Sequence, residues 1–471
     1  MKKTKLVYTI SQYENDEDII KKLILSGINV ICLNLLFSNY ELCESVVKKV
    51  RKINKELNTN VGILFETKGS NIMIRTFSDR GILLNLNDII TLTPDKNNIG
   101  ENRFNISFKK LSFDLDIDTI ILLDYGKIKL KVVEINNADI KCVVLKGGIL
   151  FDNRILTVPN EKISIDYLSV DEKKDIMFAS KLKVDFIALS CLRNANDILD
   201  VNDILIGEKN EFTEIIAKIE HSNALDDIDN IIKVCDGIIV CRDELSSQVL
   251  YGQMPIIQKE IVKKAKEKNK KCIITYNKLL TNYNNDFISN LNIYDISNSI
   301  IDGIDAIFLK NCISDDNNVL ETIDYIVKVI CETENKLDYN KMLLDMYDEK
   351  IYDSTSILAY SSVEISNLLK AKAIFVSSTS GYTSRKISHF RPMCPIVVVT
   401  PYKEVATSLS LNWGVVSIVE PKFDSLDFVV DIAKRQTKKM LNLHDEDVIV
   451  VTGSLSNKKS RGSNFLKIEK I

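Results

Sequence analysis

The sequence predicts an α/β protein: a (β/α)8 TIM barrel, a small all-β domain inserted after its third strand, and a C-terminal doubly wound α/β domain. Short apolar runs alternate with stretches of helical spacing before about residue 70 and again after Pro159. The segment between them has short β-like runs separated by Asn, Asp and Gly, and no convincing helix. A new alternation begins near residue 340. We expect the first barrel part at 1–69, the inserted domain at 70–160, the second barrel part at 161–339 and the α/β domain at 340–471.

Eight apolar runs are predicted to be the barrel strands, with helical stretches between them. One such stretch is "DEDIIKKLILSG", in which Gly27 is suited to end the helix. Eight alternating units close a parallel barrel, and such barrels carry their active sites at the C-terminal ends of the strands. The runs before the insertion are "KLVYTI", "INVICLNLL" and "VGILFET", and those after it are "VDFIALS", "EIIAKIE", "DGIIVCR", "KCIITYN" and "IDAIFLK".

The other two domains are predicted from their own strand patterns. The insertion contains "IITLT", "TIILLD", "KIKLKVVEI" and "IKCVVL", which indicates a small all-β domain. The C-terminal segment contains "AIFVSS", "PIVVVT", "WGVVSIV" and "DVIVVTG" between helical stretches, which is typical of a doubly wound α/β domain.

Composition narrows the class of protein. The formal net charge of −3 favours neither a nucleic acid nor an anionic membrane as partner. No apolar stretch approaches the roughly 20 residues that a membrane span needs, and the acidic N-terminal segment does not resemble a secretory signal. The ten cysteines are scattered without a C-x-x-C pair, as in a cytoplasmic protein with reduced thiols.

The fifth predicted barrel strand, "EIIAKIE", carries a cation and an anion in an otherwise apolar run. Side chains alternate along a strand, so Lys218 and Glu220 point the same way at its C-terminal end. This places both at the mouth of the barrel, where chemistry is expected. The alternative is a simple ion pair at the end of a strand.

Several motifs, taken in order along the chain, resemble those of the pyruvate kinase family. "GINVICLN" resembles its G-M-N-V-A-R-L-N, "ETKG" its D-T-K-G, and "IIAKIEH" its I-I-S-K-I-E-N. Further on, "DGIIVCRDEL" resembles D-G-I-M-V-A-R-G-D-L-G, and "FRPMCPIVVVT" resembles Y-R-P-x-A-P-I-I-A-V-T. Each motif alone is a weak signal, whereas the ordered set over nearly the whole chain is specific.

The resemblance implies phosphoryl transfer from phosphoenolpyruvate to ADP with Mg2+ and K+. Lys218 matches the lysine that stabilises the transferring phosphoryl group, and Glu220 matches a magnesium ligand. Phosphoryl transfer depends mainly on positioning and on neutralisation of charge by cations, which this pair would supply. Other matched positions are Ser190 and Lys68 toward the substrate, and Asn34, Glu66 and Thr67 toward cations.

Several family positions hold different residues here, which predicts a weakened site. The family arginine that grips phosphate is Cys32, and a thiol makes no bidentate charged contact. The potassium-binding serine is Leu36, so the K+ site is expected to be weakened or lost. The arginine of the P-E-I-R motif aligns with Met73, and Arg75, two residues on, is a candidate substitute that faces the same way on a regular strand.

The segment "VCRDELSSQ" leaves two alternatives for a second metal ligand. Glu244 replaces the ligand Asp while Asp243 replaces a loop Gly, which would set a carboxylate against the anionic substrate. Alternatively the loop is one residue shorter and Asp243 is the ligand. Asn277 replaces a Thr of the proton-delivery end, and "KNCIS" replaces the S-G-E-T segment after the eighth strand.

The C-terminal segment contains "VSSTSGYTSRK", which resembles the family's sugar-phosphate effector loop. Hydroxyls and backbone N–H groups of such a loop suit a phosphate. The alternative is a capped helix start beside a solvated basic turn. The predicted effector-binding residues are Ser378, Thr379, Ser380, Gly381 and Thr383, with Arg461 and Gly462 in a facing loop.

Three functions are compatible with this pattern. The favoured one is a catalytically impaired subunit that forms a tetramer-like homo- or hetero-oligomer with an active pyruvate kinase and modulates it. The second is a divergent but active pyruvate kinase. The third is a pseudoenzyme that binds a metabolite, such as phosphoenolpyruvate, a nucleotide or a sugar phosphate.

Overall fold

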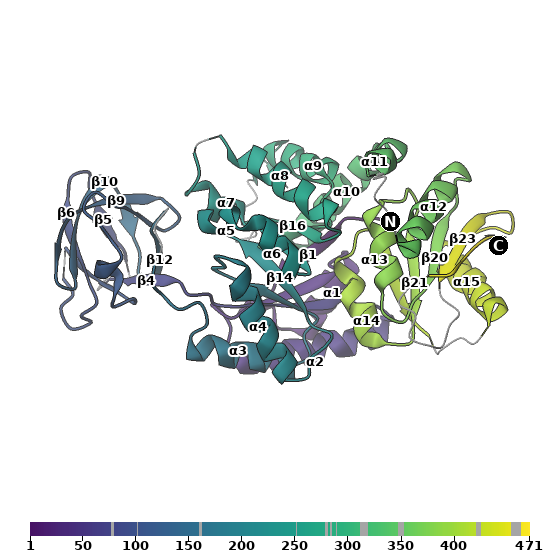
Figure 1. Cartoon of the computed structure of the whole chain (residues 1–471), viewed down its shortest axis with the longest axis horizontal. Coiled ribbons are helices and arrows are strands. Elements are labelled where there is room, and N and C mark those ends of the chain that lie inside the picture. Colours follow the sequence, from purple (N-terminus) through teal and green to yellow (C-terminus); the bar gives the residue numbers. More distant parts are fainter. Residues whose placement is uncertain are drawn as a thin grey trace.

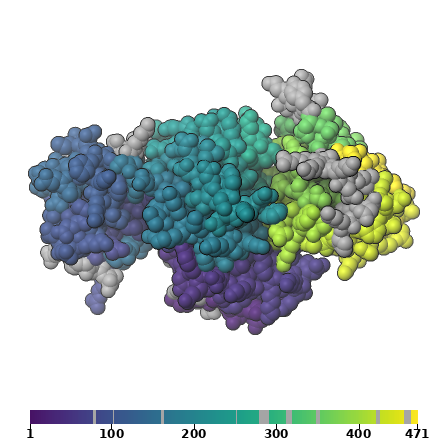
Figure 2. Space-filling view, turned by 60° about the horizontal axis from the view of Figure 1, so that its bottom comes forward, coloured from purple at the N-terminus to yellow at the C-terminus, as the bar shows by residue number. Residues whose placement is uncertain are grey.

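The chain forms three bodies in a row in a computed structural model (Figure 1). The small β-domain lies at one end, the α/β barrel in the middle, and the C-terminal α/β domain at the other end, next to the N-terminus (Figure 1). In the space-filling view the N-terminal residues form one flank of the barrel (Figure 2). The structure describes residues 1–76, 80–100, 102–159, 163–250, 252–277, 281–282, 285–288, 290–310, 319–346, 353–420, 425–453 and 463–471.

Eight parallel strands close the central barrel, which confirms the predicted fold class. All eight predicted apolar runs form these strands, and each pairs with the neighbour that a (β/α)8 order requires. The strands, in order around the barrel, are β1 (Lys5–Thr9), β19 (Ala306–Leu309), β16 (Lys271–Tyr276), β15 (Gly237–Val240), β14 (Glu214–Ile219), β13 (Phe186–Leu189), β3 (Gly62–Glu66) and β2 (Val30–Asn34).

Helices cover the outside of this barrel because each has one apolar face. In the helix Tyr40–Leu57, the Asn39 side chain accepts from the Leu42 N–H at the start, and Asn58 ends the helix in a left-handed conformation. The barrel helices are α1 (Glu17–Leu25), α2 (Tyr40–Leu57), α3 (Val170–Lys181), α4 (Ala195–Gly207), α5 (Ser222–Asp226), α6 (Ile228–Val234), α7 (Arg242–Ser246), α8 (Met254–Glu267), α9 (Asn290–Asp302) and α10 (Val319–Glu334). The hairpin β17 (Thr281–Asn282) and β18 (Asn285–Ile288) precedes α9, and α11 (Tyr339–Asp345) follows α10.

Alternation along the barrel strands separates two apolar layers. Side chains such as Cys32, Leu64 and Ile216 fill the barrel interior, whereas their chain neighbours pack against the helices. The next inward position toward each C-terminal end therefore belongs to the mouth. Those positions hold polar residues, and this arrangement creates the candidate site.

The inserted domain is a second, smaller closed barrel with its own apolar core. The four predicted runs form strands, and further short strands complete the barrel. Its strands are β4 (Ile72–Arg75), β6 (Ile89–Thr93), β7 (Arg103–Ile106), β8 (Ile120–Leu123), β9 (Ile128–Asn136), β10 (Asp139–Lys146) and β12 (Arg154–Thr157), and β5 (Ile82–Leu84) pairs with β11 (Gly148–Leu150).

The C-terminal domain is a five-stranded sheet with helices on both faces. Alternate residues of its central strands enter two different apolar clusters, as a doubly wound sheet requires. The antiparallel edge strand at residues 465–470 was not among the predicted runs. The elements are α12 (Ser354–Leu368), β20 (Ala373–Ser377), α13 (Tyr382–His389), β21 (Ile396–Thr400), α14 (Lys403–Ser408), β22 (Val415–Val419), α15 (Leu426–Leu441), β23 (Val448–Gly453) and β24 (Phe465–Lys470).

A buried ion pair joins the barrel to the C-terminal domain. The Arg391 guanidinium donates to Asp305 Oδ1 at 2.8 Å and to the Gly303 carbonyl at 2.8 Å. The same guanidinium lies 5.1 Å from the ring centre of Trp413. Because both charged groups are removed from water, each depends on the other for neutralisation.

The sequence predicts reduced cysteines and no membrane-spanning helix. Every cysteine within the described ranges is a free thiol. None of the helices seen there combines the length and apolar character that a bilayer span requires.

We predict that Arg391→Met destabilises the fold by about 3–5 kcal/mol, because Asp305 would keep a buried charge without its partner. Chemical denaturation followed by Trp413 fluorescence would measure the loss, since the indole lies beside the pair. The control is Arg435→Met, which removes a guanidinium that is 65% exposed. A loss no larger than that of the control would contradict the prediction.

Candidate active site

A cavity of about 280 Å³ lies at the C-terminal mouth of the barrel. Its walls come from the ends of the barrel strands and from the small domain, which contributes Tyr125 and Arg154. Most of the residues predicted to serve catalysis, substrate binding or metal binding line it, although they are far apart in the chain. The predicted residues in its lining are Asn34, Glu66, Thr67, Lys68, Ser190, Lys218, Glu220, Glu244 and Asn277.

Lys218 lies at the centre of this cavity wall and is almost fully buried. Its ammonium is 2.7 Å from Glu66 Oε1 and 2.5 Å from Glu220 Oε1, and it donates to Ser190 Oγ at 2.8 Å. Glu220 Oε2 also accepts from the Cys191 N–H at 2.7 Å. The pair predicted from "EIIAKIE" is therefore part of a larger network that includes a carboxylate from another strand.

Lys310 is a second buried cation at the mouth, and its contribution was missed from the sequence. Its ammonium lies 3.1 Å from Glu66 Oε1 and 3.6 Å from Glu244 Oε1. Two residues before it, Phe308 fills the barrel interior. The alternation that pointed Lys218 inward therefore applies equally to Lys310, and would have found it.

The pKa values in this network follow from burial and charge together. Burial by itself would raise the pKa of Glu66, but the charges of Lys218 and Lys310 outweigh it and lower that pKa to about 2. Burial would lower the pKa of Lys218, whereas Glu220 and Glu66 raise it well above its usual value. The pKa of Lys310 rises for the same reason despite burial, chiefly through Glu66.

The residues on β2 and β3 complete the wall around Glu66. Glu66 Oε2 accepts from Asn34 Nδ2 at 3.0 Å and lies 3.7 Å from Cys32 Sγ. Thr67 Oγ1 accepts from the Ser190 N–H at 3.1 Å. Cys32 packs in the barrel interior behind this wall, where burial and the charge of Glu66 raise the thiol pKa well above its usual value, so the group is neutral.

The two candidate metal ligands in "VCRDELSSQ", Asp243 and Glu244, lie in different places. Glu244 is buried and lines the cavity, whereas Asp243 is exposed and lies outside it. Arg242 turns away from the mouth, donating to Asp295 at 2.6 Å and stacking 4.3 Å from the Tyr276 ring centre. Helix α7 begins at Arg242, so Asp243 and Glu244 point to different sides.

Two buried oxygens, one on Glu244 and one on Asn277, have no hydrogen-bond partner among the described residues. Asn277 Nδ2 lies 3.5 Å from Glu244 Oε1. Glu244 Oε2 and Asn277 Oδ1 are buried, and neither has a hydrogen-bond partner among the described residues. Buried polar atoms are nearly always satisfied, so this pair is suited to a cation or water.

The basic residues predicted to bind substrate are divided between two places. Lys68 lines the cavity and forms an ion pair with Asp175 at 3.1 Å. Arg75 is exposed at the end of β4 and does not line the cavity, so its position gives the proposed substitution for Met73 no support. Arg154, which the sequence did not single out, is the arginine that lines the cavity within the described residues.

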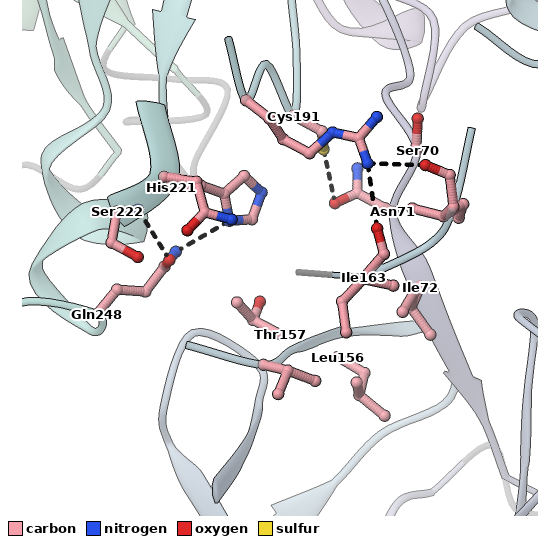
Figure 3. Close-up of a pocket in the computed structure, with 14 residues that line it drawn as sticks. Ser70, Asn71, Ile72, Leu156, Thr157, Ile163, Cys191, His221, Ser222 and Gln248 are labelled. Atoms are coloured by element: carbon pink, nitrogen blue, oxygen red, sulfur yellow. Dashed lines mark hydrogen bonds between the residues drawn. The ribbon is translucent and has the colours of Figure 1, made fainter. Parts of the chain in front are cut away.

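A second, smaller cavity of about 80 Å³ lies between the small domain and the barrel (Figure 3). There Cys191 Sγ donates to Asn71 Oδ1 at 3.1 Å, and Gln248 accepts from the Ser222 N–H at 3.2 Å (Figure 3). Its polar groups are mostly bonded to one another, and it lies where the chain crosses between the two domains.

The predicted effector loop lies at the start of α13. Ser378 Oγ accepts from the Gly381 N–H at 2.9 Å, and Thr383 Oγ1 lies 2.8 Å from Ser463 Oγ. Gly381 has a φ of 75°, a conformation that favours glycine. Thr379 and Ser380 are exposed. Arg461 and Gly462 lie outside the described residues, so the effector site stays a prediction.

We predict that Glu66→Gln lowers stability by about 3–5 kcal/mol at pH 7, because two buried ammonium groups lose a shared counterion. The pKa of Glu66 lies below its usual 4.5, so its contribution is present above pH 4.5 and lost as the pH falls toward 2. Denaturation midpoints of wild type and variant should therefore converge over that interval. Exposed Glu211→Gln serves as control, and a pH-independent gap would contradict the assignment.

Comparison with known proteins agrees with this architecture. The barrel-domain model of pyruvate kinase matches residues 1–322, and the pyruvate kinase alpha/beta-domain model matches residues 356–469. The chain is 30% identical over 474 residues to a pyruvate kinase of Clostridium perfringens, covering 100% of both. It is 28% identical over 470 residues to one of Clostridium acetobutylicum, covering 100% of this chain and 99% of the relative. A crystal structure of a pyruvate kinase from Cryptosporidium parvum shares the fold, with a TM-score of 0.89 at 23% identity over 100% of this chain and 96% of that one. The chain belongs to the pyruvate kinase family.

Proposed function

We propose that this chain is a pyruvate kinase-family subunit with impaired turnover of phosphoenolpyruvate and ADP, and that it assembles with an active pyruvate kinase and modulates it. The observation that carries the proposal is the charge state of the cavity wall. Both barrel ammonium groups, Lys218 and Lys310, are already paired with carboxylates. The family's phosphate-gripping guanidinium is replaced by the thiol of Cys32. Phosphoryl transfer depends on positive groups that contact the substrate phosphate, and the paired ammonium groups of this site are less able to do so.

The donors at the mouth fit the magnesium ion that the family generally uses. Among the described residues that line the cavity, Glu244 Oε2 and Asn277 Oδ1 are buried oxygens without a hydrogen-bond partner, and Glu220 lines the same cavity. Carboxylate and amide oxygens are the ligands that Mg2+ prefers. When bound, the ion would neutralise phosphate charge. Lys218, held by Ser190 and by its carboxylate partners, would supply a further positive charge to the same cavity.

Family members are typically oligomeric, and helices α8 and α9 offer a surface for assembly. These neighbouring helices, on the same side of the barrel (Figure 1), carry exposed apolar side chains. Scattered exposed apolar residues are normal, but a group of large ones suits a protein interface. The group consists of Ile256, Leu291, Tyr294 and Ile301, exposed by 60%, 70%, 68% and 57%.

A divergent but active pyruvate kinase is the second candidate, and one observation favours it. Arg154 lines the cavity from the small domain, so a guanidinium reaches the mouth by another route. The Nε atom of this side chain is buried without a hydrogen-bond partner among the described residues. Arg154 would then bind the phosphate in place of the family arginine, whose position Cys32 occupies.

We predict that the purified chain turns over slowly in a lactate-dehydrogenase-coupled assay with phosphoenolpyruvate, ADP, Mg2+ and K+. Cys32→Arg should raise kcat/KM by about tenfold or more, because a restored charged contact contributes at least ~1.4 kcal/mol. Asn196→Arg, at an exposed position on α4, is the control for an added arginine. Rapid turnover by the wild type that is lost in Arg154→Met would favour a divergent active pyruvate kinase and would contradict the impaired subunit.

We predict that Ile256→Asp and Tyr294→Asp dissociate the assembly, because a charge would be buried in an apolar contact. Sedimentation velocity of the pure chain, and of the chain mixed with an active pyruvate kinase from the same cell, measures the change. Leu368→Asp, at a 77% exposed position on α12, is the matched control. Recovery from the native cell without another pyruvate kinase chain would argue against the regulatory role.

A further inference from the structure

We infer that the ammonium of Lys310 takes the role of a bound cation at the barrel mouth. It lies between Glu66 and Glu244, and the chain therefore binds no exchangeable K+ beside Glu66. This goes beyond the proposed function and does not depend on whether turnover is impaired. It concerns only which positive charge neutralises the carboxylates at the barrel mouth.

The geometry places the ammonium between a carboxylate at the end of strand β3 and one on helix α7. Lys310 Nζ is 3.1 Å from Glu66 Oε1 and 3.6 Å from Glu244 Oε1, and its side chain is only 13% exposed. Phe308 fixes the inward direction of this strand end because it packs in the barrel interior. Lysine donates three hydrogen bonds and accepts none, so it suits a wall of acceptors.

The oxygen atoms that a potassium ion would need are engaged or missing. Asn34 Oδ1 accepts from the Leu36 N–H at 2.8 Å, which turns its Nδ2 toward Glu66. That amide nitrogen is a donor and repels a cation. Leu36 contributes an apolar side chain to the cavity, and Thr67 Oγ1 accepts from Ser190. The donor set beside Glu66 therefore does not fit K+.

Charge balance points to the same conclusion. The carboxylates of Glu66, Glu220 and Glu244 face the ammonium groups of Lys218 and Lys310, which leaves a formal charge of −1. Without Lys310 the formal charge would be −2, and a mobile cation would be attracted far more strongly.

The test is direct cation binding by the full chain in tetramethylammonium chloride at constant ionic strength. Thallium(I) serves as a spectroscopic probe for the potassium site, and K+ is the competitor. Four proteins are compared: wild type, Leu36→Ser, Lys310→Met, and the double variant Lys310→Met with Leu36→Ser. Exposed Lys263→Met controls for the loss of a positive charge elsewhere on the barrel.

We expect no saturable, K+-competed thallium binding in the wild type or in Leu36→Ser, which restores a hydroxyl but keeps the ammonium. The double variant should show saturable, K+-competed thallium binding, with a Kd at least ~10-fold below the highest thallium concentration at which the wild type and Leu36→Ser show none, which is about 1.4 kcal/mol. Binding by the wild type or by Leu36→Ser, or no gain in the double variant, would overturn the inference. If removal of the side chain prevents folding, Lys310→Gln takes its place, and the wild-type and Leu36→Ser arms still decide. Low activity of any variant would leave these outcomes unchanged.

Discussion

The carboxylate of Glu66 holds the mouth of this barrel together. One of its oxygens is shared by two lysines from different strands, and the other accepts from Asn34. A carboxylate so deeply buried is stable only when its charge is matched, and the two ammonium groups do this. Lys218 in turn neutralises the charge of Glu220, and Lys310 neutralises that of Glu244. The charge of the whole cavity therefore depends on one side chain at the end of β3.

The barrel scaffold and the charged network at its mouth depend on different sets of residues. Barrel closure depends on apolar side chains inside and outside the sheet, and these are indifferent to what lies at the rim. The rim residues contribute charge and hydrogen bonds instead. Leu36 lines the cavity and Cys32 packs in the barrel interior beside Glu66, and the barrel closes with both of them.

The three bodies of the chain meet at polar contacts of different kinds. Arg391 and Asp305 join the C-terminal domain to the barrel through a buried ion pair. The small domain reaches the mouth with Tyr125 and Arg154, which line the cavity without a buried charge pair to the barrel wall among the residues that the structure describes. The first junction favours a fixed geometry, while the second brings the guanidinium of Arg154 to the cavity from a separate domain. This division matters for function because the cavity is completed only by two domains together.

Sequence patterns alone determined the fold class, the eight barrel strands and the shared direction of Lys218 and Glu220 at the barrel mouth, because side chains alternate along a strand. The resemblance to pyruvate kinase motifs, rather than alternation, added Asn34 and Glu66 to the same site. Other features depended on contacts between distant segments. Short strands of the small domain and the edge strand β24 exist only through their partners. The start of α7 decided that Glu244 enters the cavity while Asp243 does not. The pairing of Lys310 with Glu66 joins the ends of β19 and β3, which are not neighbours in the barrel, and its pairing with Glu244 reaches helix α7. Only the closed tertiary structure could bring that ammonium to those two carboxylates.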